Sequence, residues 1–359
     1  MCGIIGAASS RNVGKLLVQG LHKMEYRGYD SAGIALHQKD SIYSLRSLGK
    51  VSLLEAGMIQ ERPKSKLGIA HTRWATHGKP SEANAHPHTS SEQVHIVHNG
   101  IIENYVELRE KLTAAGYAFT SETDSEVIAH LLHQHLKASE DLLDAMHSTI
   151  TELDGAYAIA AIHLNDKDRL IVARNKSPLL IGVGMEENFA ASDPLALSHL
   201  TNKFVFLKDG DVAEINRDDY QIYSAKGVSV TREITEIDIA VNAVTKGKYS
   251  HFMEKEIYEQ PDAVANTING KLGEDDVLDN IFGLGSSEVF KDIKRIQLLH
   301  AAPVYTQEKL EDFGLKKLPK FHATLILQAS IATEILWLKR ARCLSPSLNL
   351  EKQQTLWQP

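Results

Sequence analysis

The first residues limit the fold of this chain most strongly, because Cys2-Gly3-Ile4-Ile5-Gly6-Ala7-Ala8 is an apolar run punctuated by glycine. Such a run predicts a buried strand that begins at Cys2. Methionine aminopeptidase removes Met1 when a small residue follows, and Cys2 would then carry both a thiol and a free α-amine. Their unperturbed pKa values are about 8.5 and about 7.7–8.0, so the amine can take the thiol proton near neutral pH. The alternative on these residues alone is an ordinary cysteine near a frayed end.

Short strand-like segments dominate the chain as far as residue 216. The predicted strands lie at 2–8, 33–37, 42–48, 67–72, 94–97, 156–163, 169–174, 179–183, 204–207 and 212–216. The spacing of apolar residues predicts helices at 12–24, 105–115 and 125–137. Many strands with few helices indicate an α+β domain in which two sheets pack face to face with helices outside.

A length of 359 residues favours two domains. The predicted boundary is the segment 236–250, where the strands end and the chain is polar and contains glycine, as expected of a linker. Residues 1–235 then form the first domain, and a second begins at residue 251. Its predicted elements are a helix over 252–269 interrupted at Pro261, a helix at 289–294 and a strand at 296–299.

Composition excludes several classes of protein. The net charge of −7 argues against a general nucleic-acid binder, and no apolar run is long enough to span a membrane. The N-terminus lacks the pattern of a signal peptide, so a cytoplasmic location is expected. Cys2 and Cys343 are the only cysteines, which excludes a disulfide framework. The 17 histidines lie in scattered motifs without a His-Glu-x-x-His pattern, so neither a metal site nor a cofactor is expected.

Amide hydrolysis by a thiolate needs donors for the oxyanion and groups that hold the substrate. Asn99 and Gly100 could supply a side-chain amide and a backbone N–H as donors, but Asn-Gly is also the strongest signal for a type I′ turn. The spacing alone favours the turn. Arg73 could bind a carboxylate through two hydrogen bonds or form a surface ion pair. Trp74 could be a lid or core aromatic, and Asp124 could bind an ammonium group or cap a helix.

Several motifs together resemble a known family, the class II glutamine amidotransferases, and within it the glutamine–fructose-6-phosphate aminotransferases. Other class II families share the N-terminal cysteine but lack the motifs Tyr-Arg-Gly-Tyr-Asp-Ser-Ala-Gly and Thr-Arg-Trp-Ala-Thr-His-Gly. The matching segments are Cys2–Gly6, Tyr26-Arg27-Gly28-Tyr29-Asp30-Ser31-Ala32-Gly33, His71-Thr72-Arg73-Trp74-Ala75-Thr76-His77-Gly78, Asn84-Ala85-His86-Pro87-His88, His98-Asn99-Gly100, Ser192–Leu197 and Lys255–Pro261.

The resemblance implies an N-terminal-nucleophile (Ntn) fold, a four-layer αββα sandwich, followed by sugar-isomerase (SIS) α/β domains. It implies glutamine as substrate, with Cys2 as the nucleophile and its own α-amine as base. It further implies a homodimer that forms through the sugar domains and transfers ammonia to fructose 6-phosphate. The implied site residues are the oxyanion donors Asn99 and Gly100, Arg73 for the glutamine carboxylate, Asp124 for its ammonium, Thr76 and His77 in the pocket, and Trp74 in a closing loop.

The resemblance stops after Leu299. The family has a phosphate-binding Ala-Cys-Gly-Thr-Ser there, whereas this chain has His300-Ala301-Ala302-Pro303-Val304. Codons can be chosen that fit residues 299–304, 328–334 and 348–355 and that, when read in the same shifted reading frame, encode three motifs of the family in the family's order. We therefore expect residues 251–299 to be only the beginning of the SIS domain and residues 300–359 to be an out-of-frame tail.

The expected activity is therefore glutamine hydrolysis without synthesis of glucosamine 6-phosphate, and the chain would lack most of the dimerising domain. Two alternatives remain open from the sequence. One is an inactive pseudogene remnant, and the other is a class II amidotransferase with a different acceptor domain.

Overall fold

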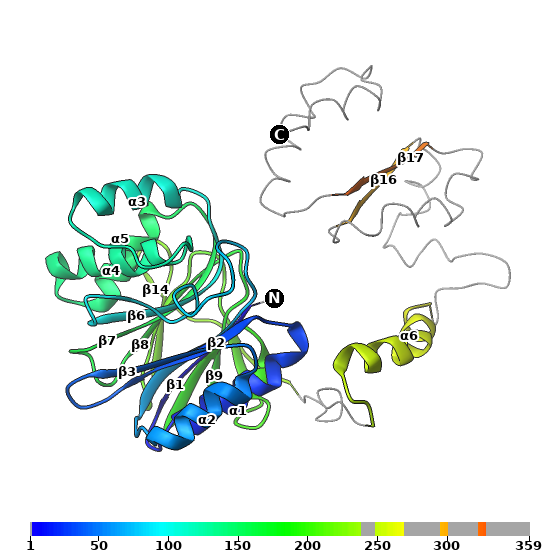
Figure 1. The fold of residues 1–359 in the computed structure, drawn as a ribbon, viewed down its shortest axis with the longest axis horizontal. Coiled ribbons are helices and arrows are strands. Elements are labelled where there is room, and N and C mark those ends of the chain that lie inside the picture. The colour runs from blue at the N-terminus through cyan, green and yellow to red at the C-terminus, as the bar shows by residue number, and fades with distance from the viewer. Residues whose placement is uncertain (1, 238–247, 269–294, 301–321, 328–359) are drawn as a thin grey trace. The chain divides into compact units, whose positions relative to one another are not determined.

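The computed structural model describes residues 2–237, 248–268, 295–300 and 322–327 (Figure 1). The chain separates into two compact units that divide between Phe252 and Met253. The predicted helix at 289–294, most of the predicted linker 236–250 and most of the predicted tail 300–359 lie outside the described residues.

The first sheet of the N-terminal unit contains the predicted strand at the N-terminus. This strand, β1 (Gly3–Ser9), lies in the interior of the sheet and pairs antiparallel with β4 (Leu67–Arg73) on one side and β10 (Glu187–Ala191) on the other. The order is β15-β11-β9-β10-β1-β4-β2-β3. The remaining strands are β2 (Ser31–His37), β3 (Ile42–Leu48), β9 (Leu180–Val183), β11 (Lys203–Phe206) and β15 (Ile234–Glu236).

The second sheet has the order β14-β13-β12-β8-β7-β6-β5. Its strands are β5 (His88–Ser90), β6 (Val94–Ile102), β7 (Gly155–His163), β8 (Leu170–Asn175), β12 (Val212–Ile215), β13 (Tyr220–Tyr223) and β14 (Ser229–Val230). The long strands β6 and β7 pair antiparallel, from Val94 opposite His163 to Ile102 opposite Gly155.

Three apolar clusters separate four layers. One lies between the sheets and joins residues such as Ile4 and Ile69 of the first sheet to Val97 and Val172 of the second. Neighbouring Ile5 belongs instead to the cluster between the first sheet and the helices outside it, because successive side chains on a strand face opposite sides. With apolar layers on both faces, β1 is apolar from Gly3 to Ala8, and only its last residue, Ser9, is polar. The fold is the αββα sandwich that the sequence predicted.

Helices cover the outer face of each sheet (Figure 1). Over the first sheet lie α1 (Gly14–Met24) and α2 (Val51–Glu61), and over the second lie α3 (Tyr105–Ala114), α4 (Glu126–Ser139) and α5 (Leu142–Glu152). The 3-10 turns η1 (Glu25–Arg27) and η2 (Pro194–Leu197) lie beside α1. The sequence predicted α1, α3 and α4 but missed α2 and α5.

The second unit is described in part. Its helix α6 (Phe252–Ile268) continues through Pro261, so the predicted interruption there is wrong. The predicted strand at 296–299 corresponds to β16 (Arg295–His300), which pairs in parallel with β17 (His322–Leu327). In the described part of the chain, no helix combines the length and apolar character needed to cross a membrane.

Candidate active site

Cys2 lies immediately before β1, where its sulfur meets the loop that follows β4. The backbone N–H of Trp74 donates a hydrogen bond to Cys2 Sγ at 3.2 Å, and the Trp74 carbonyl oxygen lies 3.5 Å from the same sulfur. The thiol is free and partly exposed. Burial raises its pKa, against the lowering effect of the Trp74 hydrogen bond. The sulfur is therefore protonated at neutral pH and needs a base before it can attack an amide carbon.

Arg73, the last residue of β4, organises the loop after it. Its Nη2 donates to the carbonyl oxygens of His77 at 2.5 Å and Gly78 at 3.1 Å, while Nη1 lies 3.5 Å from Asp30 Oδ1. The other carboxylate oxygen of Asp30 accepts from the Ala75 N–H at 2.5 Å. Only 4% of Arg73 is exposed, so the alternative of a surface ion pair is wrong.

Trp74 stands on the outside of this loop, and 53% of it is exposed, so it is not a core residue. Its ring lies over Gly28, where a Cβ atom would approach Trp74 Cζ3 to 2.6 Å. The exposed Thr76 follows, with its hydroxyl 3.4 Å from His77 Nδ1. An exposed aromatic next to the sulfur fits a loop that can cover a bound substrate.

Asn99 and Gly100 lie within β6 and not in a hairpin turn, which corrects the reading favoured by spacing alone. Asn99 Nδ2 donates to the Cys2 carbonyl oxygen at 3.3 Å. Gly100 adopts φ +139° beside β7, and a Cβ atom there would lie 1.9 Å from the Ala156 carbonyl oxygen. Only glycine can occupy this position, so the pairing of β6 with β7 itself requires Gly100.

Asp124 is buried just before α4, but the N-cap position of that helix is Ser125, so the helix-cap alternative is wrong. Asp124 Oδ2 accepts from the N–H of Ile102, the last residue of β6, at 2.8 Å. Its Oδ1 lies 3.8 Å from His77 Nδ1. The carboxylate is thus fixed two residues beyond Gly100 on one side and faces the His77 loop on the other.

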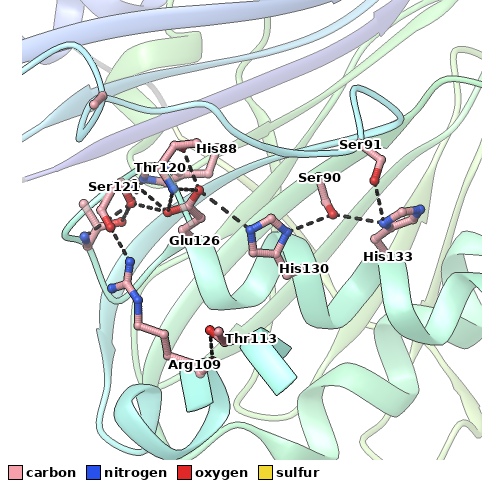
Figure 2. A network of polar contacts seen from close by, with 12 residues as sticks. His88, Ser90, Ser91, Arg109, Thr113, Thr120, Ser121, Glu126, His130 and His133 are labelled. Carbon is pink, nitrogen blue, oxygen red and sulfur yellow. Dashed lines mark hydrogen bonds and ion pairs between the residues drawn. The ribbon is translucent and has the colours of Figure 1, made fainter. Parts of the chain in front are cut away.

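A polar network supports the segment that precedes Asp124 (Figure 2). The buried carboxylate of Glu126 accepts from the backbone N–H of Thr120 at 2.9 Å and of Ser121 at 2.7 Å, and from both hydroxyl groups. His130 continues the network to Ser90 at 2.9 Å. Although burial opposes it, the hydrogen bonds from His130, Thr120 and Ser121 lower the pKa of Glu126, so this residue is a carboxylate.

The structure brings most of the predicted site residues together. Cys2 contacts the Trp74 backbone and the Asn99 amide directly, while Arg73, His77 and Asp124 are linked through the loop after β4. Thr76 lies at its exposed edge. Within the described residues, no three His, Cys, Asp or Glu side chains are grouped so that they could hold a metal ion.

Sequence reasoning missed two supporting residues near the sulfur. Arg27 Nη1 donates to the Cys2 carbonyl oxygen at 3.2 Å, and its Nη2 lies 3.0 Å from Asp193 Oδ2. Asp30 holds the loop as described above. Both belong to the Tyr26–Gly33 motif, which contributes to the family resemblance but from which the sequence predicted no site residue.

Comparisons with known proteins agree with this geometry. A glutamine amidotransferase domain matches residues 71–199. In solved structures, the fold resembles a glutamine phosphoribosylpyrophosphate amidotransferase from B. subtilis complexed with ADP and GMP. That likeness has a TM-score of 0.54 at 24% identity and covers 62% of this chain and 49% of that one. The chain therefore has the fold of this amidotransferase and carries a glutamine amidotransferase domain.

Relatives in sequence narrow the class. A glutamine–fructose-6-phosphate aminotransferase [isomerizing] from Idiomarina loihiensis is 48% identical over 340 residues, which is 94% of this chain and 55% of the relative. One of the same name from Shewanella oneidensis is 49% identical over 305 residues, 85% of this chain and 50% of the relative. The chain is thus similar to these aminotransferases over most of its own length, and it spans about half the length of the relatives it matches.

Proposed function

We propose that this chain hydrolyses the side-chain amide of L-glutamine to glutamate and ammonia with Cys2 as nucleophile. The observation that carries the proposal is the surrounding of Cys2. The Trp74 N–H donates a hydrogen bond to the Cys2 sulfur, and Asn99 Nδ2 lies 3.3 Å from the Cys2 carbonyl oxygen. A nucleophile next to a neutral N–H donor is the arrangement that attack on an amide carbonyl requires.

In the proposed reaction, removal of Met1 frees the Cys2 α-amine, which takes the thiol proton. The thiolate then forms a C–S bond to the amide carbon while the carbonyl electrons move to oxygen, where the Asn99 and Gly100 N–H groups stabilise the negative charge. The C–N bond then breaks, and the protonated α-amine of Cys2 returns its proton to the leaving ammonia. Water attacks the thioester, and the C–S bond breaks to release glutamate and the thiol.

The remaining predicted residues would hold the amino-acid end of glutamine. Arg73 is assigned to its α-carboxylate and Asp124 to its α-ammonium, because a buried guanidinium and a buried carboxylate match these charges. Thr76 and His77 complete the pocket, and Trp74 belongs to the covering loop. The 3.8 Å separation between His77 and Asp124 supports a single pocket.

We assign residues 1–235 to the glutaminase domain, 236–250 to a linker, 251–299 to the beginning of a SIS domain and 300–359 to an out-of-frame tail. Fructose 6-phosphate and a homodimer then belong to relatives of full length. This assignment is supported by relatives about twice as long as this chain and by the sequence His300-Ala301-Ala302-Pro303-Val304, which replaces the expected phosphate-binding motif after Leu299. The nucleotide sequence around the Leu299 codon tests the tail directly.

The activity is tested on the purified full chain by measuring the mass of its N-terminal peptide and glutamate release from glutamine. We expect loss of Met1 and glutamate production that falls to background in Cys2→Ser but persists in the matched control Cys343→Ser. A processed chain that releases no glutamate contradicts the proposal and favours an inactive remnant. Formation of glucosamine 6-phosphate when fructose 6-phosphate is added contradicts the domain assignment.

A further inference from the structure

One buried imidazole contacts the proposed oxyanion donor from the side opposite Cys2. His71 lies on β4, is 1% exposed, and has no role in the reaction described above. Its Nε2 lies 2.9 Å from Asn99 Oδ1 and 3.1 Å from the His98 carbonyl oxygen. The Asn99 side chain is therefore held between His71 on one side and the Cys2 carbonyl oxygen on the other.

The His98 carbonyl oxygen decides which group donates. A backbone carbonyl can only accept, so Nε2 of His71 must carry the hydrogen. Asn99 must then turn its oxygen toward His71, because the opposite orientation would bring its NH2 group against an N–H group. The NH2 group consequently faces Cys2, as a donor to an oxyanion must. One imidazole N–H thus fixes the orientation of the Asn99 amide.

The surroundings of His71 keep this tautomer. Its Nδ1 is buried and has no hydrogen-bond partner among the residues that the structure describes, as suits a nitrogen without a hydrogen. The ring packs against His86 at 4.1 Å between centroids. Burial lowers the pKa of His71 to about 3 and that of His86 well below its usual range. His71 therefore remains neutral and does not serve as a general base near pH 7.

We propose that His71 is a positioning residue for amide hydrolysis, because its Nε2–H holds the Asn99 amide with the NH2 group facing the oxyanion. The inference rests on the proposed glutaminase function. It predicts a selective defect: without the N–H group, Asn99 can rotate and lose its donor alignment in the transition state. Binding of glutamine by Arg73 and Asp124 is not affected.

The test compares His71→Leu, which has similar volume and no N–H, with His71→Gln, whose amide can return a donor near Nε2. Loss of one oxyanion donor costs about 10²–10³ in kcat. We expect His71→Leu to lower kcat at least about tenfold and at most by that range, with KM changed less than about threefold. His71→Gln should recover most of kcat.

Two further measurements separate positioning from general damage. In an Asn99→Ala background, His71→Leu should have little additional effect on kcat, because it acts through Asn99. Alkylation of Cys2 by iodoacetamide should proceed at the wild-type rate in His71→Leu. In that displacement the sulfur–carbon bond forms as iodide leaves, the thiol proton passes to the α-amine, and no oxyanion develops.

The inference is wrong if His71→Leu keeps wild-type kcat, if its effect is equally large without Asn99, or if alkylation slows in parallel with hydrolysis. Failure of His71→Gln to recover activity also counts against it. If the wild-type chain is alkylated but releases no glutamate, the proposed function itself fails and this inference falls with it. An active wild type with an unaffected His71→Leu variant rejects the inference alone.

Discussion

Gly100→Ala would place a methyl group where the ladder between β6 and β7 leaves no room. The added Cβ would lie 1.9 Å from the carbonyl oxygen of Ala156 and 2.7 Å from its carbonyl carbon. Both atoms belong to the backbone of β7, so they cannot rotate away as a side chain could. The strands must instead separate by about 1.5 Å before the contact becomes ordinary, and Asn99 moves with its strand.

Two costs contribute to the expected loss of stability. A residue with a side chain at φ +139° costs on the order of 1–3 kcal/mol. Separation of the strands weakens hydrogen bonds worth about 1 kcal/mol each, which brings the expected total to roughly 3–5 kcal/mol. Gly116→Ala is the matched control, because Gly116 also has positive φ, +90°, but nothing lies within 4 Å of its added Cβ. It should incur only the first cost.

Urea unfolding followed by far-ultraviolet circular dichroism measures the difference between the two variants, and glutamate release measures the effect on the site. We expect Gly100→Ala to be less stable than Gly116→Ala by at least about 2 kcal/mol, with kcat reduced about 100-fold or more. Equal stability of the two variants, together with wild-type kcat in Gly100→Ala, would refute the reasoning.

Other predictions concern the surrounding elements. Glu126→Gln should destabilise the domain by about 2 kcal/mol and raise KM for glutamine, because buried N–H and O–H donors lose their carboxylate partner. Urea unfolding and steady-state kinetics measure the two effects, and the control Glu110→Gln, at an exposed position, should change neither. Burial lowers the pKa values of His71 and His88 to about 3, so the unfolded chain binds more protons below about pH 6.5. Each should remove up to about 1.4 kcal/mol of stability per pH unit between about pH 6 and 4, and flat urea midpoints over that range would contradict this. Trp74→Ala should leave stability within about 1 kcal/mol, since the ring is exposed, while raising KM.

Local patterns predicted most of the strands that are buried on both faces, although they missed β10. The N-terminal run is one example, because Ile4 and Ile5 face different apolar clusters. Prediction failed where pairing with a distant strand overrides local preference. Asn99 and Gly100 favour a turn by themselves, yet nine consecutive pairs with β7 keep them extended.

One of the helices that the sequence analysis missed could have been predicted from the sequence. Helix α5 buries Leu142, Ala145, Met146 and Thr149 at helical spacing, and Asp141 caps it through the N–H groups of residues 143 and 144. The periodicity and the cap are both present in the sequence.

The site itself was only partly predictable. The residue types that amide hydrolysis needs could be named, and the resemblance gave them roles. Spacing could not predict that Cys2 meets Asn99, 97 positions away, because sheet topology makes that contact. The role of His71 depends on two acceptors converging on one nitrogen, which no linear pattern encodes.

The interior position of β1 also determines when, during translation, the strand can acquire both of its neighbours. One neighbour, β4, follows early, but the other, β10, ends at Ala191. At about 5–20 residues per second, roughly 10–40 s of translation separate the emergence of Cys2 from that of its last strand partner. During this interval the N-terminus has only one side of its final sheet, so an aminopeptidase can reach Met1. The processing that the proposed reaction requires can thus precede closure of the sheet around Cys2.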